Sequence, residues 1–248
     1  MILGIDIGNS NIVAGLIEKD KVISVFRTET DYSMSVKSCL DYLDSAIKYA
    51  NPENAVISSV VKPLTPIMEE ALCALGFNPF IVNHSLKTGL NFSIENPEKL
   101  GCDRIADCAA AAALYPLPAV VIDFGTATTI SVIGRGAVFL GGAIAPGLKM
   151  SAKALSGGTS QLPLVEIESP AGCIGKNTCD CIKSGIILGT ASMADGMIAR
   201  IENILGTSVC AVATGGLAKI VVPHCARSLI LDRNLLLRGL GIIYDLNR

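Results

Sequence analysis

The sequence predicts an α/β fold made of two related halves, and a near repeat carries this prediction. The segment GIDIGNSNIVAG begins at Gly4, and a segment of the same character, IDFGTATTISVIG, begins at Ile122. In both, an apolar strand ends in an acid, Asp6 or Asp123, followed by one apolar residue, a glycine and small residues. Strand-like apolar runs then alternate with apolar residues at helical spacing. Two halves of this kind predict a cleft between them, which is a natural ligand site.

The first half opens with three short apolar segments, which predict an antiparallel strand meander. Apolar residues at helical spacing then predict helices, each followed by a short buried strand. The expected strands are 2–8, 11–18, 21–28, 55–61 and 80–82, and the expected helices are 34–50 and 64–75. A further helix is expected to start at the cap formed by Asn96 and Pro97 and to continue to Leu114.

Pro116 and Pro118 mark the expected boundary, so the predicted domains are residues 1–116 and 117–248. The second half again opens with a three-strand meander, followed by a long helix, a strand and a final helix. The expected strands are 119–123, 128–133, 137–143 and 209–213, and the expected helices are 178–205 and 234–246. The final helix can pack back on the first half.

Composition excludes several function classes. The net charge is −2 and the 20 basic residues are spread without a run, so we expect no nucleic-acid partner. The most apolar long stretch, 109–122, is interrupted by Pro116 and Pro118, so we expect no membrane span and no membrane partner. The chain has no basic start, so we expect no signal peptide. Nine scattered cysteines favour reduced thiols and a cytoplasmic protein.

The two acid–glycine turns predict a phosphate site. A strand that ends in Asp-x-Gly can place a carboxylate at the floor of a cleft, and the glycine lets a phosphate approach the backbone. Small residues after the glycine offer N–H donors, while the acid faces a bound cation. The alternative is that such residues only close a hairpin, as most turns of this composition do. Two copies in equivalent places favour the phosphate site.

Five motifs in order give the sequence a family resemblance. They are the turns at Asp6 and Asp123, GCDR at 101–104, GGAIAPG at 141–147 and GKNTCDCIKSG at 175–185. Together they resemble the type III pantothenate kinase family, over nearly the whole chain. The resemblance implies duplicated RNase H-like domains of the acetate kinase, sugar kinase, Hsp70 and actin type. It also implies ATP-dependent phosphorylation of pantothenate to 4′-phosphopantothenate, which opens coenzyme A biosynthesis, and a homodimer.

The family pattern also implies site residues. Asp103 matches the general base, although an acid in a first helical turn can also serve only the helix dipole. The expected substrate-binding residues are Gly101, Cys102, Asp103, Arg104 and Thr178. A Thr that opens a helix can bind the pantothenate carboxylate with the free N–H groups there, or it can simply cap the helix.

The nucleotide site follows in the same way. The expected nucleotide-binding residues are Asp6, Ile7, Gly8, Asn9, Ser10, Asn11, Ile12, Val13 and Thr126. Asp6 is expected to face magnesium through water, and Asp123 to bind a monovalent cation, potassium or ammonium. Cations are needed because two like charges about 4 Å apart repel by about 4 kcal/mol at an effective dielectric constant of about 20.

One position departs from the family pattern, because Ile94 stands where members commonly carry an aromatic residue. Two alternatives stay open at this point. The chain can be another small-molecule kinase or phosphatase of the same superfamily, or a nucleotide-binding accessory protein without turnover. The acids Asp6, Asp103 and Asp123 argue against the second alternative, since a protein without turnover has no use for a base.

Overall fold

The computed structural model describes residues 1–48 and 50–248, and these residues form two units. The first consists of Met1–Leu114 with Asn234–Arg248, and the second of Tyr115–Arg233. The final helix therefore belongs with the first unit, whereas the sequence boundary was drawn at 116/117. The helix expected over 34–50 includes residue 49, which lies outside the described residues.

The first unit holds a mixed sheet with strand order β3-β2-β1-β4-β5. Strands β1, β2 and β3 form the expected antiparallel meander, while β4 and β5 run parallel to β1. The strands are β1 Ile2–Ile7, β2 Asn11–Glu18, β3 Lys21–Glu29, β4 Ala55–Ser59 and β5 Phe80–Ile81, followed by β6 Asn91–Phe92. The helices are α1 Val36–Ile47, α2 Thr65–Ala74, α3 Cys102–Leu114 and α7 Leu235–Asn247.

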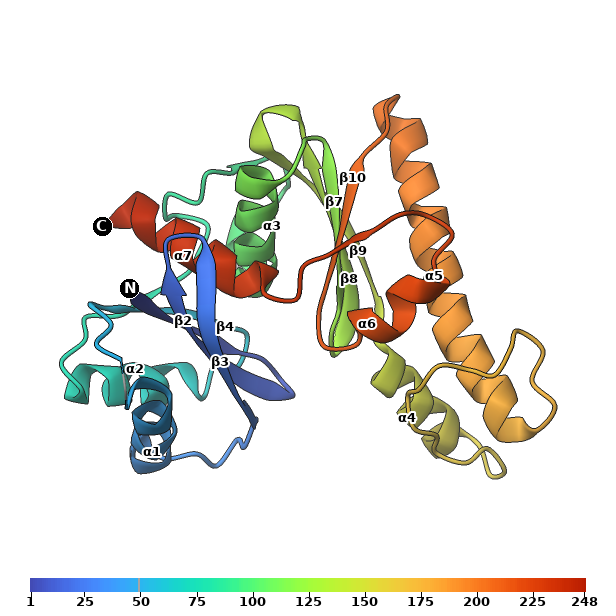
Figure 1. Cartoon of the computed structure of the whole chain (residues 1–248), viewed down its shortest axis with the longest axis horizontal. Coiled ribbons are helices and arrows are strands. Elements are labelled where there is room, and N and C mark those ends of the chain that lie inside the picture. Colours follow the sequence, from blue (N-terminus) through green and yellow to red (C-terminus); the bar gives the residue numbers. More distant parts are fainter. Residues whose placement is uncertain (49) are drawn as a thin grey trace. The chain divides into compact units, whose positions relative to one another are not determined.

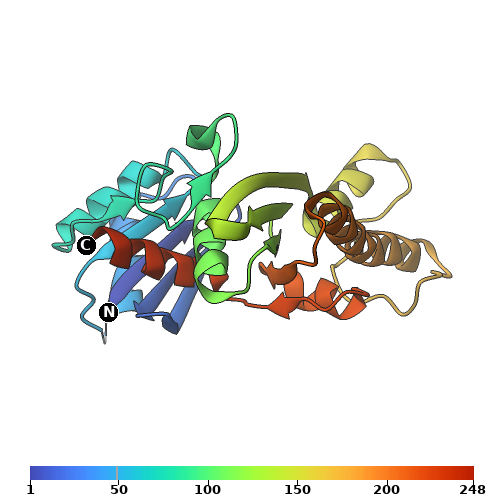
Figure 2. The same cartoon turned by 90° about the horizontal axis from the view of Figure 1, so that it is seen from above.

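Side-chain alternation along β1 divides this unit into two cores. Leu3, Ile5 and Ile7 face α1 and α2, whereas Ile2 lies in the second core, with α3 and α7. Asp6 is an even-numbered residue of β1, so it points to the face of the sheet covered by α3 and α7. These two helices lie side by side in both views (Figures 1 and 2).

The second unit repeats the same topology, with strand order β11-β10-β7-β8-β9. Its meander is antiparallel, and β10 and β11 run parallel to β7. The strands are β7 Ala119–Phe124, β8 Ala127–Gly134, β9 Val138–Pro146, β10 Cys210–Thr214 and β11 Ile230–Leu231. The helices are α4 Leu148–Gly158, α5 Thr178–Leu205 and the short α6 Ala218–Val221. Figure 1 shows α5 as the long helix beside this sheet.

The two meanders match strand for strand. β1 and β7 both have six residues, β2 and β8 eight, and β3 and β9 nine. β1 and β7 share one burial pattern, in which only the acid is half-exposed. The pairing register shifts after Leu16 in one meander and after Val132 in the other, which are equivalent positions. The repeat predicted from the sequence therefore extends to irregularities of the sheet.

The structure corrects one predicted helix and adds elements that the sequence did not predict. The continuous helix expected from Asn96 to Leu114 is wrong, because a 3₁₀ turn at Pro97–Lys99 is separated from α3 by Leu100 and Gly101. Helix α4 was not predicted at all. A search of the described residues finds no helix long and apolar enough to cross a membrane.

Candidate functional site

The first acid–glycine turn joins β1 to β2. The backbone N–H of Gly8 donates to the carbonyl of Asn11 at 2.9 Å and closes the turn. The Thr30 hydroxyl donates to the carbonyl of Gly8 at 2.6 Å, and the Tyr32 hydroxyl bonds to the Asn9 side chain at 3.2 Å. Asn9 and Ser10 are exposed at the tip, whereas Ile7 and Ile12 are buried and anchor the turn in the sheet. The turn is thus fixed at its base and open at its tip.

Asp6 is held from the neighbouring parallel strand. Ser58 of β4 lies opposite Asp6 in the register, and its hydroxyl donates to Asp6 Oδ1 at 2.9 Å. Ser58 is fully buried, while Asp6 is half-buried. Oδ2 of Asp6 lies toward Gly8, 4.0 Å from where a side chain at that residue would begin.

Cys102 fixes the start of α3 on the end of β4. Its thiol donates to the backbone carbonyl of Ser59 at 2.9 Å and accepts from the Ser59 N–H at 3.0 Å. Burial raises the pKa of this thiol, and the charges of Asp103 and Asp6 raise it further. Both carboxylates therefore lie close to one buried sulfur. The Cys102 side chain points into the unit, so any substrate contact of this residue is made by its backbone.

Asp103 follows in the first turn of α3 and is half-buried. Its Oδ1 accepts from the backbone N–H of Arg104 at 2.8 Å. A side chain on Gly101 would collide with Asp103 Oδ1, so the glycine makes room for the carboxylate. Burial raises the pKa of Asp103, and the Arg104 N–H and guanidinium oppose this shift only in part. A carboxylate that holds its proton more tightly than usual is a stronger base, which suits proton abstraction.

The second acid–glycine turn joins β7 to β8 and is one residue shorter. The Gly125 N–H donates to the Ala127 carbonyl at 3.1 Å. Asp123 is half-buried and pairs in register with Thr214 of β10. The next residue, Gly215, has a φ of +94°, and a side chain there would collide with Asp123 Oδ1 and the backbone of Phe124. The backbone after β10 thus lies directly against the acid.

A second glycine approaches the same turn from α4. Gly147 precedes this helix as its N-cap residue, and a side chain on it would collide with the carbonyl oxygens of Gly125 and Thr126. The start of α4 is therefore packed onto the turn that carries Thr126, which itself is exposed. The positive end of a helix dipole beside a turn of small residues suits an anion such as a phosphate.

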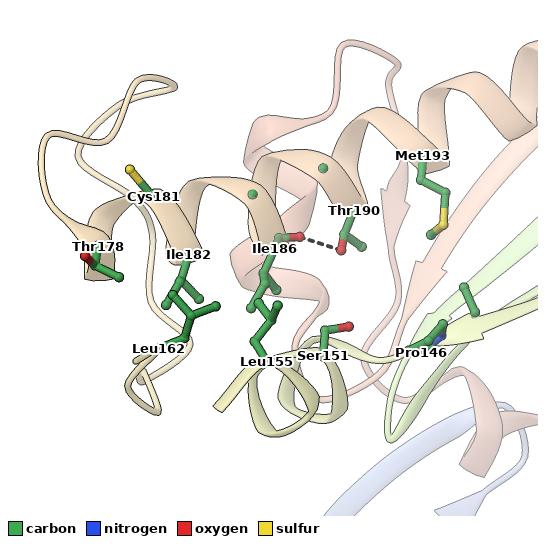
Figure 3. A pocket seen from close by; sticks show the side chains of 13 residues that line it. Pro146, Ser151, Leu155, Leu162, Thr178, Cys181, Ile182, Ile186, Thr190 and Met193 are labelled. Atoms are coloured by element: carbon green, nitrogen blue, oxygen red, sulfur yellow. Dashed lines mark hydrogen bonds between the residues drawn. The ribbon is translucent and has the colours of Figure 1, made fainter. Parts of the chain in front are cut away.

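Thr178 is the first residue of α5, but it does not cap the helix. The cap is Asn177, whose Oδ1 accepts from the Asp180 N–H at 2.9 Å. The Thr178 side chain is exposed and lies at the edge of a pocket of about 530 Å³ within the second unit. Figure 3 shows the pocket between α4 and α5, with Leu155 and Ile186 pointing toward each other. Its lining is mainly apolar.

The predicted residues thus fall into two groups. The Asp6 turn and the GCDR segment meet in the first unit, around Ser58 and Cys102, whereas Asp123, Thr126 and Thr178 belong to the second unit. Sequence reasoning missed Ser58, Thr214 and Gly215. The string ATGG at 213–216 directly after a buried strand was a signal for the last two, but no local signal marks Ser58.

The donors at the first turn fit magnesium. Within residues 1–48 and 50–248, no group of three or more His, Cys, Asp or Glu side chains could hold a metal ion. Magnesium rarely needs such a cage, because it keeps several waters and binds one or two carboxylates together with substrate phosphates. A single half-buried carboxylate beside a turn with an exposed tip, as at Asp6, supplies what this mode requires.

Comparison with known proteins gives one consistent result. The sequence pattern of the type III pantothenate kinase family matches residues 2–200. A relative named type III pantothenate kinase from Halalkalibacterium halodurans is 38% identical over 256 residues, covering 100% of both chains. Another relative of that name, from Brevibacillus brevis, is 39% identical over 257 residues and also covers 100% of both chains.

Solved structures with low sequence identity share the fold. The glucokinase of the ROK family from Streptomyces griseus, solved with glucose and AMPPNP, superposes with a TM-score of 0.52 at 14% identity, covering 100% of this chain and 99% of that one. The ethanolamine utilization protein EutJ from Carboxydothermus hydrogenoformans gives 0.56 at 14% identity, covering 98% and 88%. The duplicated RNase H-like α/β fold expected from the motifs is confirmed.

Proposed function

This chain belongs to the type III pantothenate kinase family and phosphorylates pantothenate at the expense of ATP, the first step of coenzyme A biosynthesis; we propose that Asp103 is its general base. The observation that supports this role is the position of Asp103, half-buried at the start of α3 and near the same buried thiol as Asp6. A base must lie where the nucleotide-binding turn can present the phosphoryl group.

The proposed step is a direct displacement. The oxygen of the primary hydroxyl of pantothenate forms a bond to the γ-phosphorus of ATP, and the bond from that phosphorus to the bridging oxygen of ADP breaks. The hydroxyl proton moves to the carboxylate of Asp103. Since the transition state of phosphoryl transfer is loose, holding the hydroxyl in line contributes as much as removing its proton. The first-turn backbone of Gly101–Arg104 supports that orientation.

We propose that residues 6–13 bind the ATP phosphates and that Thr126 contributes from the second turn. Magnesium, held by Asp6 through water, would neutralise charge on the phosphates. The tip formed by Asn9 and Ser10 is exposed, which leaves a phosphate room to approach the backbone of the turn. For Asp123 we propose a monovalent cation, potassium or ammonium, since its carboxylate lies beside Gly125 in the turn that carries Thr126.

Thr178 is proposed to bind the pantothenate carboxylate. Its hydroxyl is not used as a helix cap, and it lies at the N-terminus of a 28-residue helix, where the dipole favours an anion. The pocket beside it offers mainly apolar walls, which suit the aliphatic part of pantothenate.

A homodimer and a cytoplasmic location are also proposed. The second unit exposes large apolar side chains, among them Ile144 (67%), Leu164 (61%) and Ile174 (86%), which favours burial against another chain. All nine cysteines lie in the described part of the chain as free thiols, which suits a reducing compartment. Sedimentation of the purified protein tests the dimer directly, and a monomer at micromolar concentration would contradict it.

The central test uses Asp103→Asn in a coupled ADP-release assay with pantothenate, magnesium and potassium. Asn keeps an oxygen that can accept from the Arg104 N–H, so the local fold should persist. We expect turnover to fall by about 10²–10⁴ while ATP binding, measured by calorimetry, is retained. Near-normal turnover would remove Asp103 from the base role. Parallel assays with sugars and acetate test selectivity for pantothenate.

A further inference from the structure

The buried side chain of Ser58 forms a hydrogen bond to Asp6 that the pairing of its strand does not require. Ser58 is 0% exposed, and its hydroxyl donates to Asp6 Oδ1 at 2.9 Å. Burying a hydroxyl costs free energy unless it is hydrogen-bonded, and a bond to a charged acceptor is stronger than one to a neutral acceptor. The bond fixes one oxygen of the carboxylate from inside the sheet, while Oδ2 lies toward Gly8 and the phosphate turn.

The next residue of β4 contacts the start of α3. Ser59, which follows Ser58, accepts from the Cys102 thiol at 2.9 Å through its carbonyl and donates to the same sulfur at 3.0 Å through its N–H. Asp103 is the next residue of that helix. Two consecutive residues of β4 therefore contact the acid proposed to face magnesium and the segment that carries the proposed base.

The repeat supplies an independent observation. In the second unit Thr214 occupies the position of Ser58, opposite Asp123 on the neighbouring parallel strand, and it is 4% exposed. Each acid thus has a buried hydroxyl residue beside it at the same register position. The remaining residues of both parallel strands up to that position are apolar, so a hydroxyl there is a feature of the acid site rather than of the strand.

We propose that Ser58 is a positioning residue that fixes one oxygen of Asp6 and thereby orients the other toward the turn proposed to hold the phosphates. This inference rests on the proposed function, in which Asp6 faces magnesium. Hydrogen-bond partners of metal-facing carboxylates typically affect metal affinity or activity by about 10–100-fold when they are removed. A serine that only fills space would affect stability without changing the response to magnesium.

The test compares Ser58→Ala with Ser24→Ala by calorimetric titration of magnesium onto the protein with a non-hydrolysable ATP analogue, and in the ADP-release assay under a magnesium titration at fixed ATP. Ser24 lies in β3 of the same sheet, and its Oγ is buried without a hydrogen-bond partner among the described residues. Ser24→Ala therefore also removes a buried hydroxyl group from this sheet, but one that is not bonded to Asp6. We expect Ser58→Ala to raise the magnesium concentration for half-maximal rate about ten-fold, with KM for pantothenate unchanged within about two-fold. Ser24→Ala should match the wild type.

Asp6→Asn separates the two proposals. If Asp6→Asn is inactive but Ser58→Ala responds to magnesium as the wild type does, the positioning role of Ser58 is overturned and the proposed function stands. If Asp6→Asn itself has wild-type kinetics, the role of Asp6 fails, and the inference fails with it. Should Ser58→Ala not fold, Ser58→Val, which also removes the donor and favours a strand, takes its place, and a wild-type magnesium response there overturns the role equally.

Discussion

Replacing Cys102 by Ala should separate the position of the base from the stability of the fold. The thiol accepts from the Ser59 N–H at 3.0 Å and donates to the Ser59 carbonyl at 2.9 Å, and Cys102 is 8% exposed. Cys102→Ala removes both bonds and leaves two backbone groups without this partner. Leaving a buried polar group unsatisfied costs about 1–3 kcal/mol, so we expect a loss of about 2 kcal/mol. In a chain of this size that corresponds to a fall in Tm of about 4–8 °C.

The catalytic effect should exceed what stability alone explains. Because Asp103 follows Cys102 directly, a shift of α3 moves the carboxylate, and a displacement of about 1 Å can cost about 10² in rate. We expect kcat to fall by about 10–100-fold, measured by ADP release well below the Tm of the variant. Cys102→Ser keeps a donor and an acceptor at this site and should retain most of the rate.

Cys39→Ala provides the matched control. Cys39 is a residue of α1, is 1% exposed and packs against the opposite face of the same sheet. Loss of its thiol should therefore lower Tm without changing kcat. If Cys102→Ala lowers Tm as Cys39→Ala does but leaves kcat at the wild-type value, the thiol only fills space and the reasoning is refuted.

Four further predictions concern the acids. Burial raises the pKa of Asp103 above its ordinary value near 3.8, so kcat should fall on acidification at a higher pH than for an unperturbed carboxylate; a pH–kcat profile with its acid limb at or below 3.8 would contradict this. Because the pKa of Asp103 is higher in the folded than in the unfolded chain, its ionisation lowers the free energy of unfolding as pH rises from about 3.8 through the raised pKa. At neutral pH the Tm of Asp103→Asn should therefore be equal to or higher than that of the wild type. Gly101→Ala should displace Asp103 Oδ1 and lower kcat by about 10–100-fold with KM for ATP unchanged, and unchanged kcat would show that the carboxylate tolerates the methyl group. Replacing potassium by sodium should lower the rate about ten-fold in the wild type but not in Asp123→Asn, whereas equal sensitivity of both would exclude Asp123 as the cation ligand.

The strands were predictable because their signal is local. Alternation and the repeated Asp-x-Gly turns predicted both meanders, and every predicted strand corresponds to one in the structure. Helix α4 was missed because its sequence, LKMSAKALSGG, ends in two glycines and buries only Leu148 and Ala152. The position of α4 depends on the contact between Gly147 and the turn at Gly125, and the amino-acid sequence alone does not reveal this contact.

The predicted site residues were found through motifs, and the residues that support them were not. Ser58 and Ser59 lie in the apolar string AVISSVV, which reads as an ordinary buried strand. Only the parallel pairing of β4 with β1 brings Ser58 to Asp6, 52 residues earlier in the chain. The break before α3 was missed for a similar reason, because Gly101 is needed by the carboxylate that folds over it rather than by the helix itself.

The duplication also explains why the chain has one proposed base rather than two. Helices α3 and α7 are both 13 residues long, and each is the last helix of its half in chain order. The first turn of α3 carries Asp103, whereas α7 begins with three leucines, and Leu237 packs beside Gly15 of β2. Gly239 then brings α7 against the backbone of Ala106 in α3. The second copy of the helix therefore holds the first in place instead of carrying a second base.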